Sequence, residues 1–548
     1  MQFEASRRID PKILTSKNDY WANVIADEVI AAFPNNEIYT VAAGISPSGI
    51  VHFGNFRDVM TSYAVLRALE GKGKKTRFIF SWDNFDRLRK VPAGVSEDFA
   101  QYIGMPLSKV PDPTGKHASY AASFQADFEV AMQALGIPLV YRNQTEMYES
   151  GAYTESVIFA MQHRKEIGEI MFSLMTEKAI EEKGLNKESF IENYYPISIY
   201  SRFSKKDSTV IESYDGEHTV TYLCKETNQK DTIDLTKDFV YKLGWKIDWP
   251  MRWRHEGVVF EPGGHDHASP GSSFDVSSLI TQKMFGLKAP LFVEYKFVGI
   301  QGVDGKMSGS KGGAVSPGQL LEIYEPRLLR WLYLRKSPHQ TFNLAFDSEI
   351  YRQYEEYDLD VEKMKKGEID HVGTPALIWS LTTNEKPHTA PTSFRQAVAF
   401  GQIMQWDNSR VAKLFDMAGA TYDQDALTIR LQKAKSWLET YNREEMIVVR
   451  TEHNTEYWTS MTDVQKANVK KLAEALLSGN LKEEEIEPLV YAIPKDDTLE
   501  QKENAARQRA FFKDVYNLVI SKDTGPRLST FIVALGMEKV GNLLKLTS

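Results

Sequence analysis

Apolar residues near the start of the chain change spacing in a regular way. An unbroken apolar run at 38–43 contains several β-branched residues and predicts a buried strand. After His52 the apolar positions recur at helical spacing over 56–69, and glycines then end the helix. A second apolar run at 78–80 predicts the next strand. This strand–helix–strand order predicts a βαβ unit with two parallel strands.

A turn rich in glycine, serine and proline (GISPSG, 44–49) joins the first strand to the helix. Free N–H groups and the helix dipole at such a helix start favour anions such as phosphates, so the turn predicts a nucleotide site. The dinucleotide pattern G-x-G-x-x-G is absent. The Lys-rich stretch 71–76 follows a helix and lacks Walker A spacing, so we interpret it as a solvated turn.

Two short segments carry candidate chemistry. In HFGN (52–55), His52 and Asn55 can donate to phosphate oxygens, and Gly54 lets a purine ring approach the backbone. An ordinary capped helix with a surface histidine would look the same. Far downstream, KMSGSKG (306–312) follows a strand-like apolar run at 291–300, and such a loop alone is more often a mobile surface turn.

Together these segments resemble the two signatures of class I aminoacyl-tRNA synthetases, "HIGH" and "KMSKS". The stretches GISPSGIVHFGN, FSWDNFDRLRKVP, WPMRW, FEPGGHDH and KMSGSKG extend the resemblance over essentially the whole chain, to the class I form of lysyl-tRNA synthetase. The first turn holds no arginine, where a glutamyl enzyme would bind its substrate carboxylate. Two other classes stay open: a nucleotidyltransferase that never touches tRNA, and a catalytically dead paralogue that only binds RNA.

Composition narrows the class further. With 548 residues the chain is too long for one core, and 42% hydrophobic with 26% charged residues is ordinary for a globular protein. No apolar run approaches the roughly 18 residues of a membrane span, and the first residues lack a secretory core, so no membrane partner is expected. A single cysteine fits a reducing cytoplasm. A net charge of −8 argues against a general DNA-binding protein but leaves room for a local tRNA-binding face. We expect a monomer.

The resemblance and the apolar pattern give an α/β fold with a Rossmann-type parallel-sheet catalytic domain, an inserted connective domain and an all-α anticodon-binding domain. The boundaries are 1–92 and 241–337 for the two catalytic halves, 93–240 for the insertion and 338–548 for the helical part. Within the insertion we expect a helix at 120–135, a strand at 139–141 and one longer helix at 157–175. The mixed basic and aromatic stretch 502–513 is either a solvated helix face or an RNA-binding surface.

Metal sites are not expected. Relatives carry cysteine pairs for zinc in the insertion, but here Cys224 has no partner, and a structural zinc site needs four Cys or His ligands. His265 and His267 would point the same way on an extended segment, yet no third ligand stands at a usual spacing, so we favour a substrate role for His267.

The resemblance implies synthesis of lysyl-adenylate from L-lysine and ATP with Mg²⁺, followed by transfer of lysine to the terminal adenosine of lysine tRNA. It implies catalytic roles for five residues: His52, Asn55, Lys306, Ser308 and Lys311. For ATP binding it implies Pro47, Ser48, Gly49, His52, Gly54, Asn55, Gly264, Asp266, Lys306, Met307, Ser308, Gly309 and Ser310. For lysine binding it implies Gly44, Ser46, Asp83 (as an ammonium partner), Trp245, His267 and Tyr295. Gly309 stands where many relatives have a second signature lysine, so the electrostatic role falls mainly to Lys306.

Overall fold

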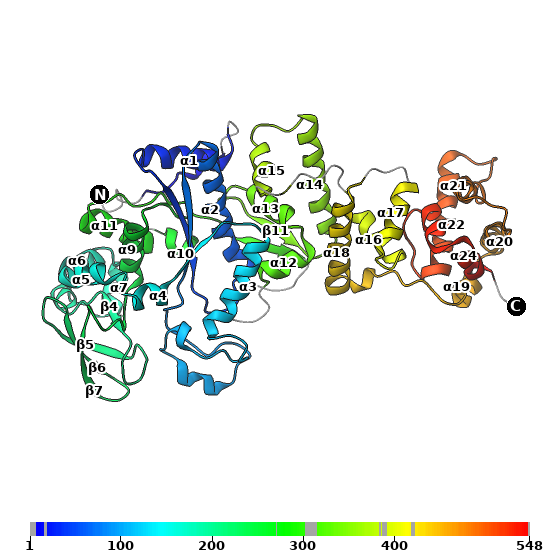
Figure 1. Ribbon diagram of the computed structural model, residues 1–548. Helices are drawn as coiled ribbons and strands as arrows, with labels where there is room; N and C mark the ends of the chain where they lie inside the picture. The colour runs from blue at the N-terminus through cyan, green and yellow to red at the C-terminus, as the bar shows by residue number, and fades with distance from the viewer. Residues whose placement is uncertain are drawn as a thin grey trace. The chain divides into compact units, whose positions relative to one another are not determined.

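A parallel four-stranded sheet forms the framework on which the other elements of the N-terminal part are placed (Figure 1). Its strands lie in the order β3-β2-β1-β9 and comprise β1 (Tyr39–Ile45), β2 (Thr76–Trp82), β3 (Val140–Asn143) and β9 (Val258–Phe260). Val41 pairs with Phe78 and Ile45 with Trp82 along the β1–β2 ladder. The strands predicted at 38–43, 78–80 and 139–141 are therefore confirmed, with shifts of one or two residues at their ends.

The computed structural model describes residues 7–15, 19–269, 271–301, 315–382, 385, 392–417 and 422–545. The chain divides into two compact units, the first formed by Met1–Leu344 with Asp360–Glu385, the second by Ala345–Leu359 with Lys386–Ser548. Within the described ranges, no helix is long and apolar enough to cross a membrane.

Both faces of the sheet are covered, which explains why its strands are apolar without alternation. On one face α2 (Phe53–Gly71) packs on β1 and β2, and Phe128 of α3 (Tyr120–Ala134) stacks on Phe80. On the other face Ala42 packs against Trp249 and Trp253 of α9 (Trp245–Glu256). Helices α1 (Trp21–Ala32) and α11 (Ser273–Phe285) pack on α2 and α9 respectively.

Helix α2 starts at His52 through a capping box. The Nδ1 of His52 accepts the N–H of Gly54 at 3.0 Å, and Oδ1 of Asn55 accepts the N–H of His52 at 3.2 Å. Two orphan N–H groups of the first turn are satisfied in this way. Buried Arg57, one turn further on, donates to the carbonyls of Ser337 at 2.6 Å and Lys336 at 3.2 Å, which joins α2 to the segment after α13.

The insertion after β2 combines short helices with two small antiparallel sheets. Strands β5, β6 and β7 form a three-stranded meander, and β4 pairs with β8. Its elements are η2 (Glu97–Tyr102), η3 (Leu107–Lys109), α4 (Gln144–Glu149), α5 (Thr154–Gln162), α6 (Arg164–Ser173), α7 (Glu177–Glu182), α8 (Lys187–Glu192), β4 (Ile197–Ile199), β5 (Thr209–Tyr214), β6 (Thr219–Cys224), β7 (Gln229–Asp234) and β8 (Tyr241–Leu243).

The remaining elements lie before and after these. The first unit also contains η1 (Pro11–Thr15), α10 (His265–Ala268), β10 (Val298–Gln301), α12 (Pro317–Ile323), α13 (Pro326–Leu334), β11 (Phe342–Ala345) and α15 (Thr374–Ser380), while α14 (Glu349–Lys366) belongs to both units. After Lys386, the described residues of the second unit form only helices: α16 (Phe394–Ile403), α17 (Asn408–Met417), α18 (Gln424–Tyr441), η4 (Arg443–Glu445), α19 (Thr455–Ser460), α20 (Asp463–Leu477), α21 (Glu483–Ala492), α22 (Gln501–Ile520), α23 (Leu528–Leu535) and α24 (Met537–Leu544).

Three local expectations are wrong. The long helix predicted at 157–175 is broken at His163, whose ring stacks on Phe159 with centroids 4.2 Å apart and whose backbone leaves the helical region. The segment 265–268 forms a short helix instead of an extended strand. The run 291–300 is buried at its start, but it joins the sheet only through isolated bridges, and its regular strand, β10, pairs with β11.

Replacement of Phe56 tests the packing of α2. Phe56 is fully buried and meets Tyr333 edge to face at 4.9 Å between ring centroids. Phe56→Ala should lower the free energy of unfolding by about 3–5 kcal/mol because it leaves a cavity in a close-packed core. Urea denaturation followed by tryptophan fluorescence measures the change. Val130→Ala, at a side chain that is 66% exposed, is the matched control and should have little effect.

Candidate functional site

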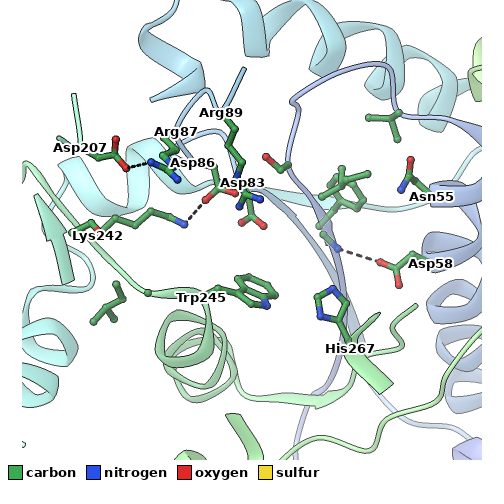
Figure 2. A pocket seen from close by; sticks show the side chains of 18 of the residues that line it. Asn55, Asp58, Asp83, Asp86, Arg87, Arg89, Asp207, Lys242, Trp245 and His267 are labelled. Carbon is green, nitrogen blue, oxygen red and sulfur yellow. Dashed lines mark hydrogen bonds and ion pairs between the residues drawn. The ribbon is translucent and has the colours of Figure 1, made fainter. Parts of the chain in front are cut away.

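A cavity of about 530 Å³ opens at the carboxyl ends of β1 and β2 (Figure 2). In parallel sheets this edge is where ligands bind. The cavity lies between the turn after β1, the segment after β2, strand β8 with the start of α9, and the segments around His267 and Tyr295. Figure 2 shows charged pairs at one end and Asn55, Asp58 and His267 at the other, with Trp245 between.

All six residues expected to bind lysine line this cavity: Gly44, Ser46, Asp83, Trp245, His267 and Tyr295. Asn55 lines it as well. They come from five separate parts of the chain, around residues 44–55, 83, 245, 267 and 295, which the fold brings together. Gly44 has no room for a side chain because an added Cβ would lie 3.0 Å from the carbonyl oxygen of Ser81.

The residues expected to bind ATP are more dispersed. His52 and Gly54 form the first turn of α2, and Gly264 lines a smaller chamber beside the cavity. Asp266 is exposed on α10 and lines neither hollow, Pro47 is buried, and Ser48 and Gly49 line a separate groove. Lys306, Met307, Ser308, Gly309, Ser310 and Lys311 lie outside the described residues.

Arg252 neutralises two buried carboxylates below the cavity. Its guanidinium donates to Asp83 at 2.5 Å and to Asp248 one turn earlier on the same helix. The hydroxyl of Tyr148 also donates to Asp248, at 2.6 Å. Burial raises the pKa of Asp83, and the charge of Arg252 opposes this rise. The ionised form of Asp83 therefore depends on its contact with Arg252. Asp83 is therefore already paired with a cation of the protein.

Two further ion pairs line the outer end. Lys242 on β8 binds Asp86 directly and lies 3.7 Å from Asp248. Burial works against the charge of Lys242, but the two aspartates outweigh it and raise its pKa. Arg87 pairs with Asp207 at 3.1 Å. Charges at this end are thus largely compensated within the protein.

Asp58 and Glu261 form no ion pair within the described residues, although Arg252 also lines their chamber and its charge lowers the pKa of Glu261. Both line the inner chamber, of about 90 Å³, whose walls include Gly44, Trp245 and His267 from the main cavity. Asp58 accepts the N–H of Gly44 at 3.3 Å; burial raises its pKa well above the usual range, and the charge of Glu261 raises it further.

Glu261 accepts only indole N–H groups, from Trp249 at 2.9 Å and Trp253 at 2.6 Å. Burial raises the pKa of Glu261 to about 7, although these two hydrogen bonds lower it. The inner chamber therefore holds two carboxyl groups whose charge a bound cation would stabilise.

Unpartnered polar atoms also mark this region as a binding site. The Nδ1 of His267 and the Nε1 of Trp245 are buried without a hydrogen-bond partner. A buried polar atom left unpaired costs about 1–3 kcal/mol, which a ligand can recover. Burial lowers the pKa of both His52 and His267, which favours their neutral rings. The Nδ1 of His52 already accepts the N–H of Gly54, so His52 offers its Nε2–H donor, whereas His267 offers one donor and one acceptor.

Sequence reasoning missed Asp58, Lys242, Asp248, Arg252 and Glu261. Two signals were present in the sequence. Asp58 follows Asn55 by three residues on the same helix, and Asp248 precedes Arg252 by four, so each pair shares a helix face. Lys242 gave no local signal, because its partner Asp86 lies 156 residues away in the sequence. Glu261 lies 12 and 8 residues after its partners Trp249 and Trp253, a spacing that matches no regular helix or strand contact.

Comparison with known proteins places this site in a family. The model of the family described as "tRNA synthetases class I (K)" matches residues 19–384, about two thirds of the chain. The chain is a member of the class I tRNA synthetases. A lysine–tRNA ligase of Streptomyces coelicolor is 36% identical, covering 96% of this chain and 98% of its own, and that of Pyrococcus horikoshii is 34% identical, covering 96% and 99%.

A solved glutamate tRNA ligase from Elizabethkingia meningosepticum aligns with a TM-score of 0.43 at 10% identity, over 92% of this chain and 98% of that one, which is too distant to add to the assignment. The matched region, residues 19–384, includes the start of α2, the residues that line the cavity and the segment 306–312.

Arg252→Met tests the charge arrangement of the cavity. It leaves Asp83 and Asp248 buried without their cation, which should lower the free energy of unfolding by about 3–5 kcal/mol. Chemical denaturation measures the change. The control Lys178→Met removes the exposed pair with Glu182 and should cost less than about 1 kcal/mol. Equal stability of the two variants would contradict the role of Arg252.

Proposed function

We propose that this class I synthetase is a lysine–tRNA ligase, which activates L-lysine with ATP and transfers it to lysine tRNA. The observation that carries the proposal is the inner chamber beside the cavity, where buried Asp58 and half-buried Glu261 form no ion pair within the described residues. The lysine–tRNA ligases that match almost the whole chain support the same substrate.

The first step is attack of the lysine carboxylate on the α-phosphorus of ATP, which forms lysyl-adenylate and releases pyrophosphate. His52 and Asn55 at the start of α2 are assigned to the phosphates, and by resemblance Lys306 and Lys311 face the leaving pyrophosphate with Ser308 beside them. Their contribution is positioning and charge stabilisation. In the second step a ribose hydroxyl of the terminal adenosine, expected to be the 2′ hydroxyl, attacks the carbonyl carbon and AMP leaves.

We assign recognition of a lysine ammonium group to Asp58 and Glu261 in place of Asp83. Asp83 already binds Arg252, whereas the inner carboxyl groups accept only neutral N–H donors. Trp245 and His267, which line both hollows, are assigned to the walls around the methylene chain. An ammonium group between two carboxylates regains the charge interactions that it loses on leaving water.

The domain roles follow the boundaries set out from the sequence: catalytic halves at 1–92 and 241–337, an acceptor-end insertion at 93–240 and an anticodon-binding part at 338–548. Across the described ranges no group of three or more His, Cys, Asp or Glu side chains is arranged to hold a metal ion, so Mg²⁺ is assigned to the phosphates of ATP. Cys224 is buried with its thiol 3.5 Å from the Ser204 hydroxyl, and no structural zinc is assigned. We also propose that the protein is a monomer and that it acts in the cytoplasm.

ATP–pyrophosphate exchange, tested with each of the twenty amino acids and with and without bulk tRNA, is the first test. Lysine should drive exchange, and His52→Ala or Lys306→Ala should lower the rate by about 100- to 1000-fold because each removes a donor to the reacting phosphates. Exchange driven by glutamate or glutamine instead would overturn the substrate. Absence of exchange under both conditions would favour a binding protein without catalysis.

The pH dependence of lysine use tests the ammonium site. Burial raises the pKa of Glu261 to about 7 and also raises the pKa of Asp58. Both carboxyl groups therefore take up protons as the pH falls, and lysine must displace these protons to bind. KM for lysine should therefore rise as pH falls below 7, by up to about tenfold per pH unit, while KM for ATP changes little. Glu261→Gln should raise KM for lysine and flatten this profile.

An analogue provides the control. 6-Hydroxynorleucine replaces the ε-ammonium of lysine by a hydroxyl. If Glu261 contacts the ε-ammonium, the wild type and Glu261→Gln should have similar KM values for this analogue. An unchanged pH profile in Glu261→Gln would contradict the assignment of this carboxyl group.

A further inference from the structure

The backbone of Phe53, between His52 and Asn55, is held by two contacts from a distant part of the chain. Its N–H donates to the carbonyl of Val315 at 2.9 Å, and its own carbonyl accepts the hydroxyl of Tyr333 at 2.9 Å. Tyr333 lies on α13, 280 residues away in the sequence, and none of the steps above uses it. The position of the first turn of α2 therefore depends on groups outside that helix.

The start of α2 offers side-chain donors in place of backbone donors. The N–H groups of residues 53, 54 and 55 all donate within the protein, the first to Val315 and the next two to Nδ1 and the carbonyl of His52. The free N–H groups expected there from the sequence are thus already bound. A phosphate at this helix start would meet the Nε2–H of His52 and the amide nitrogen of Asn55 instead. Asn55 also lines the cavity (Figure 2).

The ring of Tyr333 is itself held from several sides. It is 1% exposed and packs edge to face against Phe56 and Phe342, with centroids 4.9 and 5.1 Å away. Arg57 donates to the carbonyl of Tyr333 at 3.4 Å, so α2 and α13 are linked in both directions. Burial raises the pKa of the Tyr333 hydroxyl well above its usual range, so this group stays a donor at physiological pH.

A purely structural role for this hydroxyl is the alternative, and the same helix provides a matched case. The hydroxyl of Tyr20, a residue that is 2% exposed, donates to the carbonyl of Leu334 at 2.6 Å. Both tyrosines are buried and both donate to a backbone carbonyl. The acceptor for Tyr20 belongs to α13, whereas the acceptor for Tyr333 belongs to the first turn of α2. A difference in catalysis between the two losses would therefore report the effect on α2.

We propose that Tyr333 is a positioning residue for adenylate formation: through the carbonyl of Phe53 it holds His52 and Asn55 where the phosphates of ATP react. The inference rests on the proposed function, which assigns those two side chains to the phosphates. Its physical basis is the steep dependence of rate on geometry, since a displacement of about 1 Å can cost about 100-fold.

Tyr333→Phe removes the hydroxyl and keeps the ring. In ATP–pyrophosphate exchange it should lower kcat by about tenfold, because the donors at the helix start lose their fixed position. KM for lysine should stay close to the wild-type value, since Asp58 is anchored separately by the N–H of Gly44 at 3.3 Å. The control Tyr20→Phe should leave both kcat and KM unchanged. Equal losses of kcat in the two variants would overturn the proposal.

A double-mutant cycle separates positioning from a general loss of stability. If Tyr333 acts through His52 and Asn55, Tyr333→Phe should lower kcat by a smaller factor in chains that already carry His52→Ala or Asn55→Ala. The same factor in all three backgrounds would show that the hydroxyl acts independently of these side chains, and it would overturn the proposal.

Crystal structures of the wild type and both tyrosine variants provide a readout that needs no lysine activation. Tyr333→Phe should displace the side chains of His52 and Asn55 or raise their temperature factors, and Tyr20→Phe should do neither. Unchanged side chains in Tyr333→Phe would overturn the proposal even if exchange is slower. A wild type that does not activate lysine, together with the expected displacement, would refute the proposed function and leave Tyr333 as the residue that positions the start of α2.

Discussion

The guanidinium of Arg252 holds two carboxylates from distant parts of the chain, and the shape of the cavity depends on that contact. Asp248 lies on the same helix, whereas Asp83 directly follows β2 and lies 169 residues before Arg252 in the sequence. The contact therefore joins the carboxyl end of β2 to helix α9. Buried ion pairs contribute little net stability, but loss of one partner is costly, which makes such a contact a strict positional constraint.

This constraint separates the carboxyl groups of the site into two sets. Asp83, Asp86 and Asp248 are neutralised by Arg252 and Lys242, so a substrate cation would have to displace a cation of the protein. Asp58 and Glu261 receive hydrogen bonds only from a backbone amide and two indoles. The contrast arises from position, because all five are carboxyl groups of one site, three of them buried and two, Asp86 and Glu261, half-buried. Charge balance is therefore the ground on which we assign the proposed ammonium site to Asp58 and Glu261 instead of Asp83.

Local patterns in the sequence predicted the βαβ unit well, because a β-branched run, a glycine turn and a 3.6-residue period each act over a few residues. The six residues assigned to lysine met at one cavity because parallel strands expose their ends on one edge. Local patterns failed where a distant or specific contact decides. The apolar period predicts one continuous helix where the chain forms two that meet at His163, and the pairing of Asp83 with Arg252 has no local signature.

The turn after β1 forms a wall of the cavity and also of the separate groove that Ser48 and Gly49 line. It is held from three sides: Tyr120 donates to the Ser48 carbonyl, the capping box fixes the start of α2, and the N–H of Phe53 donates to the carbonyl of Val315 at 2.9 Å. These contacts involve no substrate, so the turn has its shape before any ligand binds. A wall that is already ordered costs no conformational entropy when a ligand binds against it, and this preorganisation favours both binding and catalysis.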